Sequence, residues 1–356
     1  MTRRACRGTD AVLRYPVANV CDGKAARVMG TSPGRRPIAP KPRPRPCDAA
    51  LPVFALWLAF SVGACGEPEY ATGAGPADTT PLACDDHDLP AAVADELALD
   101  TSFYAQACSA FGVPVLGSVR LSGTTLALAT ELVSGVLAPL APNVRDAIHD
   151  RYLRVVIVAA SAGETFSDVP ELADLREAER AAAGIGPDPM FPAATVRDSV
   201  VLCRPVHREP AVTPPGDTLV HELGHAVLSM GLEPTQPDFR RRLSHAFTQA
   251  AGLARWQTEL SPEVRQRFGS RLETPYLMTN ADEYWAVGVS VWFGFVGVPI
   301  RYELTDAREE TLRITWLYGR SQLRQRDPPL AALLEEVFGE EPTLAHHCSG
   351  WFPQNP

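Results

Sequence analysis

Three residues in the spacing H-E-x-x-H, namely His221, Glu222 and His225, offer the clearest chemistry in the sequence. On a helix, residues four apart lie on the same face, so His221 and His225 can present two imidazole nitrogens to one tetrahedral Zn²⁺. Glu222 lies one step round, too far aside to be a ligand, but it can act as general base on a water that the metal activates. The alternative is a pair of ordinary helix histidines, and we favour the zinc site.

Catalytic zinc takes three protein ligands and keeps one position open. The metzincin extension would require Gly at position 228 and His at position 231, but the chain has Leu228 and Gly231, so that class is excluded. A Glu from a later helix is then the expected third ligand, and Glu283 is the candidate. Its place in the first turn of a helix capped by Asn280 also suits a capping box, and Asp282 is a rival ligand. Three other glutamates of this region read as solvated: Glu259, Glu263 and Glu273.

The H-E-x-G-H helix is followed by Thr279-Asn-Ala-Asp-Glu-Tyr-Trp-Ala286, with Tyr276 seven residues before Glu283. This pairing resembles the anthrax lethal factor type of gluzincin metallopeptidase, and also a group of bacterial and fungal secreted proteins. The resemblance implies that Glu283 is the third zinc ligand. It also implies that the Tyr276 phenol hydrogen-bonds the oxyanion of the tetrahedral intermediate, a role suited to a neutral donor of high pKa. The alternative for Tyr276 is a packing aromatic.

One position departs from the family pattern, which usually has a second carboxylate four residues after the ligand. This chain has Val287 there. Such a carboxylate can orient a metal-binding His, and its loss typically costs about 10–100-fold in metal affinity or activity. Either another acid takes its place, or this member is a weak or inactive enzyme.

The elements that must position these residues follow from hydrophobic spacing. Asp217 suits the N-cap of the H-E-x-x-H helix and Gly231 its end. The runs Arg154–Ala160 and Ser199–Cys203 predict buried strands, the second bordering the cleft and able to pair with an extended peptide. The segment between that strand and the helix has four prolines and includes His207, which we interpret as a solvated loop residue. This order predicts an α+β fold, a zincin-like metallopeptidase domain that is mostly helical with a small mixed sheet.

Further helices are predicted along the chain from the 3.6-residue spacing of apolar residues. They cover Leu89–Leu99, Ser102–Phe111, Thr124–Ala138, Val144–Tyr152, Phe239–Trp256, Asp306–Tyr318 and a segment capped by Asp327. His245 lies off the apolar stripe of its helix, and His346 and His347 lie at a ragged end, so we interpret all three as solvated.

The amino-terminal region reads as an export signal. Basic, Pro-rich residues precede the short apolar run 51–60, and Val62-Gly-Ala-Cys65 resembles the lipobox of bacterial lipoproteins, which implies lipidation of Cys65. The expected domains are a signal peptide at 1–64 (with Met29 as a possible true start), a lipid-anchored flexible tether at 65–83, and a zincin-like catalytic domain at 84–356. An ordinary signal peptide is the alternative. The expected location is the cell envelope, on a membrane through the lipid anchor.

Charge and cysteine content narrow the partners. Residues 1–50 carry 11 Lys and Arg against 3 Asp and Glu, whereas residues 65–356 carry 22 against 39, a net charge of −17. So acidic a body argues against nucleic acid as a partner. In an exported chain the four cysteines after Cys65 predict two disulfides, with Cys84–Cys108 and Cys203–Cys348 the favoured pairing.

The expected function is that of a zinc metallopeptidase acting on a peptide or protein substrate. Two alternatives remain: a zincin-fold lipoprotein that binds without turnover, and a metal-dependent hydrolase of another amide.

Overall fold

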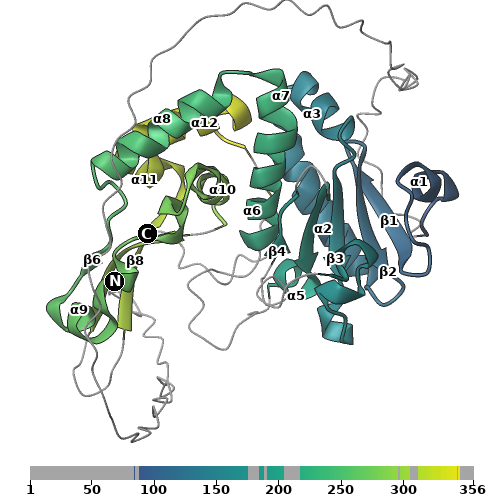
Figure 1. Ribbon diagram of the computed structural model, residues 1–356, viewed down its shortest axis with the longest axis horizontal. Coiled ribbons are helices and arrows are strands. Elements are labelled where there is room, and N and C mark those ends of the chain that lie inside the picture. The colour runs from purple at the N-terminus through teal and green to yellow at the C-terminus, as the bar shows by residue number, and fades with distance from the viewer. Residues whose placement is uncertain are drawn as a thin grey trace, which may run out of the picture. The chain divides into compact units, whose positions relative to one another are not determined.

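The computed structural model describes residues 84, 88–174, 184–187, 191–203, 217–295, 297–304, 312–342 and 344. These residues form an α+β fold with a mixed sheet, as the sequence predicts (Figure 1). Within them, no helix is both long and apolar enough to cross a bilayer. The predicted signal peptide, the Cys65 lipidation site, the tether, His207, His346 and His347 lie outside the described residues.

The larger sheet has the order β1-β2-β3-β5-β4. Its strands are β1 (Tyr104–Ala110), β2 (Val113–Ser118), β3 (Arg154–Val158), β4 (Gly184–Ile185) and β5 (Ala193–Arg197). The pairs β2–β3 and β3–β5 are parallel, whereas the outer pairs β1–β2 and β4–β5 are antiparallel. The short strand β4 therefore lies at one edge of the sheet.

Strand β3 is buried on both faces, which explains its run of β-branched residues. Val155 and Ile157 belong to the main hydrophobic core, together with apolar residues of helices α2 (Gly123–Leu137) and α6 (Asp217–Ala226). Val156 and Val158 face a second, smaller core on the other side of the sheet. The 3₁₀ turns η2 (Phe166–Asp168) and η3 (Pro170–Leu172) contribute Phe166 and Leu172 to this second core, and the turn η1 (Ala160–Ala162) precedes them. The prediction of a buried strand at Arg154–Ala160 is thus confirmed for Arg154–Val158.

Helix α6 (Asp217–Ala226) lies between the sheet and helix α10 (Ala281–Trp292). Helices α8 (Phe239–Gly252) and α12 (Pro328–Phe338) pack together beyond α10 (Figure 1). The other helices are α1 (Ala91–Glu96), α2 (Gly123–Leu137), α3 (Pro142–His149), α5 (Asp198–Val201), α7 (Glu233–Thr235), α8 (Phe239–Gly252), α9 (Pro262–Phe268), α11 (Gly319–Arg326) and α12 (Pro328–Phe338). The 3₁₀ turns η5 (Gly269–Leu272) and η6 (Tyr276–Met278) lead into α10. The helix carrying H-E-x-x-H is therefore buried between a sheet and a second helical layer.

A second sheet has the order β6-β7-β8, formed by β6 (Glu259–Leu260), β7 (Gly297–Leu304) and β8 (Leu312–Tyr318).

Asp327, which begins α12, is fully buried and accepts hydrogen bonds from Trp256 Nε1 (2.7 Å) and Tyr284 Oη (2.6 Å). It also accepts one from the backbone N–H of Leu330. The prediction that Asp327 caps this helix is confirmed, and its buried partners tie the helix to α10.

Three secondary-structure predictions are wrong, because tertiary pairing overrides local helix and strand propensity. Ser102–Phe111, predicted as a helix, contains strand β1, which turns into β2 through Phe111 and Gly112, both at positive φ (51° and 80°), as a two-residue hairpin turn requires. Asp306–Tyr318, predicted as a helix, forms strand β8 over its described part. Ser199–Cys203, predicted as a strand, begins within helix α5, and the strand lies earlier, at β5.

Gly231 does not end the H-E-x-x-H helix as predicted. The helix widens into a π-helical turn, η4 (Val227–Leu232), and continues into α7. A Cβ at position 231 would lie 2.7 Å from Val144 Cγ1 and 3.1 Å from Ile148 Cδ1, both on α3. This glycine is therefore explained by close packing of the π turn against α3.

The remaining predictions concern helices and disulfides, and they are confirmed in part. Helices are confirmed at α2, α3 and α8, but α8 ends at Gly252, short of the predicted end at Trp256. Cys84 and Cys108 form a disulfide, as predicted. Cys348 lies outside the described residues, so its pairing with Cys203 stays a prediction.

Candidate metal centre

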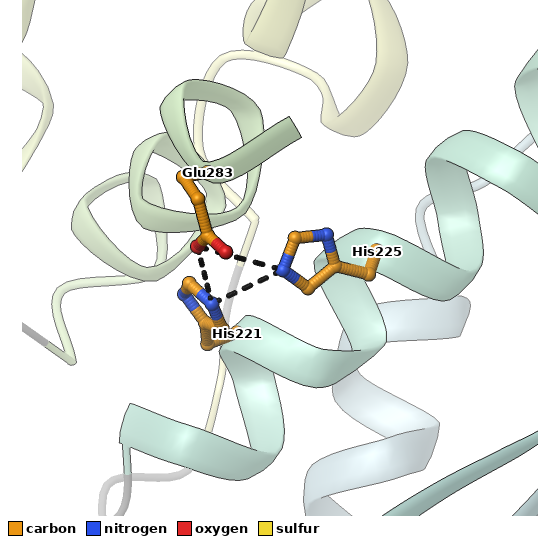
Figure 2. A group of neighbouring side chains, drawn as sticks. All are labelled: His221, His225 and Glu283. Atoms are coloured by element: carbon orange, nitrogen blue, oxygen red, sulfur yellow. Dashed lines mark hydrogen bonds and ion pairs between the residues drawn. The ribbon is translucent and has the colours of Figure 1, made fainter. Parts of the chain in front are cut away.

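Three polar atoms converge between α6 and α10. His221 Nε2 lies 3.1 Å from Glu283 Oε2, His225 Nε2 lies 3.6 Å from the same oxygen, and the two Nε2 atoms are 3.2 Å apart (Figure 2). All three side chains are largely shielded from solvent. Among the described residues, this is the group of three that could hold a metal ion.

The three distances fit a tetrahedral zinc site. Ligands at about 2.0–2.1 Å from a tetrahedral centre are separated by about 3.3 Å, close to the separations of 3.1, 3.2 and 3.6 Å between these atoms. Glu283 Oε2 is also buried without a well-aligned hydrogen bond among the described residues. A buried carboxylate oxygen that faces two imidazole nitrogens, with no N–H aligned on it, is suited to a cation.

The electrostatics of Glu283 favour its charged form. Burial by itself raises the pKa of a carboxyl group, but the polar contacts and charge of His221 and His225 outweigh burial and hold the pKa of Glu283 well below its ordinary value. The group is therefore an anion at neutral pH, as a metal ligand must be.

Glu283 reaches the histidines because α10 approaches α6 very closely at Gly224, the fourth residue of His-Glu-Leu-Gly-His. A Cβ at position 224 would lie 3.0 Å from the Cα of Ala286 and 3.4 Å from its Cβ. At the same crossing, Trp285 Nε1 donates a 3.0 Å hydrogen bond to the Gly224 carbonyl oxygen. Gly224 and Ala286 thus set the separation of the two helices that carry the three side chains.

Asn280 fixes the beginning of α10, as predicted. Its Oδ1 accepts hydrogen bonds from the backbone N–H groups of Asp282 (2.8 Å) and Glu283 (2.9 Å). The Glu283 side chain is directed at the histidines of α6 (Figure 2). The cap thus holds the backbone while the carboxylate remains available to the site.

Glu222, the predicted general base, is buried between α6 and the edge strand β4. A Cβ at Gly184 would lie 2.9 Å from Glu222 Oε1, and one at Gly186 would lie 2.7 Å from Oε2 and 3.5 Å from His225 Cδ2. Ile185, between them, packs into the smaller core on the other face of the sheet. Because Gly184 and Gly186 have no Cβ, this segment can approach both oxygens of the Glu222 carboxylate. The sequence analysis does not identify this contact, although the G-x-G spacing is a signal that could have indicated it.

Tyr276 lies in η6 beside the site, with its ring centroid 6.1 Å from that of His221. Tyr276 is 62% exposed, so it does not pack in the core, as the alternative interpretation of this residue would require. Partial burial of the hydroxyl, a hydrogen bond with Glu283 and the charges of Glu283 and Glu222 raise the pKa of this phenol well above its ordinary value. It therefore stays protonated at neutral pH and remains a hydrogen-bond donor.

The rival ligands lie elsewhere or have other partners. The Asp282 carboxylate pairs with Arg240, while Glu259 pairs with Arg301 (2.7 Å) and Glu273 with Arg265. Glu263 is exposed, and His245 is exposed and contacts Gln249. Val287, where the sequence resemblance implies a second carboxylate, packs against the hydrophobic core.

A scan against protein-family models, a search of curated proteins and a search of solved structures found no match to this chain.

Proposed function

We propose that this chain is a zinc metallopeptidase with a zincin-like catalytic domain, in which His221, His225 and Glu283 hold Zn²⁺. The observation that carries the proposal is the convergence of two imidazole nitrogens and one anionic carboxylate at the separations of a tetrahedral site. Zn²⁺ bound there supplies Lewis-acid chemistry, polarising the scissile carbonyl and making a water more acidic.

The protein groups around the site supply the proton transfers and charge stabilisation of peptide hydrolysis. Glu222 takes a proton from water as the water oxygen attacks the carbonyl carbon. Glu222 then gives that proton to the amide nitrogen as the C–N bond breaks. The Tyr276 phenol, protonated at neutral pH, donates a hydrogen bond to the oxyanion that develops on the carbonyl oxygen.

A peptide substrate is favoured over other amides by strand β4, which lies at the edge of the larger sheet and directly beside Glu222. An edge strand can pair with an extended peptide through backbone hydrogen bonds, which would bring a scissile bond alongside the general base. The acidic body gives a mild preference for uncharged or basic substrates. Attachment to the cell envelope rests on the lipobox-like sequence ending in Cys65.

The second candidate is a zincin-fold lipoprotein that binds metal and partner without turnover. Val287 favours it, because an apolar side chain stands where a carboxylate would orient a histidine.

Incubation of the zinc-loaded chain with a peptide library, read by mass spectrometry, separates the two candidates. The peptidase proposal predicts cleavage that falls at least about 100-fold in Glu222→Gln while zinc stays bound. Zinc binding with no cleavage by the parent chain would overturn the peptidase and leave the binding module.

A further inference from the structure

One guanidinium group spans the two elements that carry the three candidate ligands. Arg240, in the first turn of α8, pairs through Nη2 with Glu233 and through Nη1 with Asp282. Glu233 begins α7, which continues from α6 through the π turn without a break. Asp282 lies on α10, immediately before Glu283. Arg240 therefore connects the continuation of the histidine helix with the first turn of the glutamate helix.

We propose that Arg240 is a positioning residue that fixes Glu283 for metal binding. Asp282 is held twice: Asn280 accepts a hydrogen bond from its backbone N–H, and Arg240 pairs with its carboxylate. Glu283 follows in the same turn and is held by the same cap. Backbone and side-chain anchors together leave the first turn of α10 little freedom to rotate, so the Glu283 carboxylate stays aimed at the two histidines.

The ion pairs act on geometry more than on stability. The side chains of Arg240, Glu233 and Asp282 are 41%, 32% and 46% exposed, and exposed ion pairs contribute little to the free energy of unfolding. The packing of α8 on α10 comes instead from apolar contacts, such as the edge-to-face pair of Phe239 and Trp285 at 5.2 Å. Loss of the guanidinium should therefore leave the fold in place while loosening the orientation of Glu283.

This role also offers a substitute for the carboxylate that Val287 replaces. Where a carboxylate on α10 would orient a histidine, this chain has an apolar residue packed in the core. Support from Arg240 reaches the ligand set through Asp282, in the first turn of that helix. The inference rests on the proposed zinc site and deepens it by naming what holds the third ligand.

The test compares zinc affinity of the full chain, measured by competition with a chromophoric chelator, between the parent and Arg240→Met. Arg241→Met is the matched control, because its side chain is 78% exposed and pairs with Asp238 at 3.7 Å, one residue along the same helix. We expect about a 10-fold weaker affinity in Arg240→Met, the lower end of effects seen for groups that orient ligands, and an unchanged affinity in Arg241→Met. Asp282→Asn should show the same loss, and the double variant no further loss, because the two groups act through one contact.

A second readout separates positioning from general stability. The absorption spectrum of bound Co²⁺ reports ligand geometry, and Arg240→Met should change it while the Tm of the metal-free chain stays within about 2 °C of the parent. An affinity equal to the parent's, or an affinity loss matched by a comparable loss of metal-free stability, would overturn the positioning role alone. A parent chain that binds no zinc would overturn the proposed function and this inference together.

Discussion

The substitution Gly224→Ala tests whether helix separation controls the metal centre. The added Cβ would lie 3.0 Å from the Cα of Ala286 and 3.4 Å from the Cβ of Val289. Ordinary carbon contacts need about 3.5–4.0 Å, so α10 must move away from α6 by about 0.5–1 Å. Because the obstacle is backbone, a side-chain rotation cannot relieve the contact.

A displacement of this size exceeds what a zinc site tolerates. Metal–ligand distances are defined to about 0.2 Å, and Glu283 belongs to α10, the helix that must move. We therefore expect zinc affinity to fall about 10–100-fold, as it does when a ligand loses its supporting contacts. Stability should change less, because the intrinsic gain of about 1 kcal/mol for Ala over Gly in a helix opposes an overpacking cost of about 1–3 kcal/mol.

The assay is a zinc titration against a competing chelator, accompanied by urea unfolding of the metal-free chain. Gly252→Ala is the control, since it makes the same change in α8 where a Cβ would have no neighbour within 4 Å. Parent-like zinc affinity in Gly224→Ala would refute the claim that this crossing positions the third ligand. Equal losses in both variants would refute it as well.

Three further outcomes are expected. Tyr276→Phe should lower kcat for peptide cleavage by about 100-fold or more while zinc affinity is kept, because it removes one oxyanion donor; unchanged kcat would dismiss that role. Asp327→Ala should cost about 2–6 kcal/mol in urea unfolding, since it leaves the buried donors of Tyr284 and Trp256 without an acceptor at about 1–3 kcal/mol each; a cost below about 1 kcal/mol would contradict the network. Burial raises the pKa of Tyr318 to about 12, above its unfolded value of about 10, so the stability it contributes is fully present below pH 10 and is lost as pH rises toward 12. Urea midpoints across this range should fall less steeply in Tyr318→Phe, and an unchanged slope would contradict the shift.

The parts of the fold that the sequence predicts well are those whose signal is local. The spacing of the two histidines, the Asn280 cap and the β-branched run of β3 each lie within a few neighbouring residues, and the structure shows each on the expected type of element. The local H-E-x-x-H spacing predicts His221 and His225, whereas Glu283 follows from the family resemblance, and the structure brings the three side chains together.

The parts that the sequence does not predict depend on distant contacts. The segment around Ala107 is rich in small helix-compatible residues, yet it is a strand because β2 pairs with it. The Arg240–Asp282 contact joins residues 42 positions apart, and nothing in either segment marks it. The absence of a Cβ at Gly184 and Gly186 matters only because β4 lies against Glu222, a contact between segments distant in the sequence.

Binding of one zinc ion by His221, His225 and Glu283 is tested most directly by the zinc content per chain in the parent and in Glu283→Ala. One equivalent of zinc is expected in the parent, and the variant should lose it. A parent without zinc, or a variant that keeps a full equivalent, would contradict binding at this site.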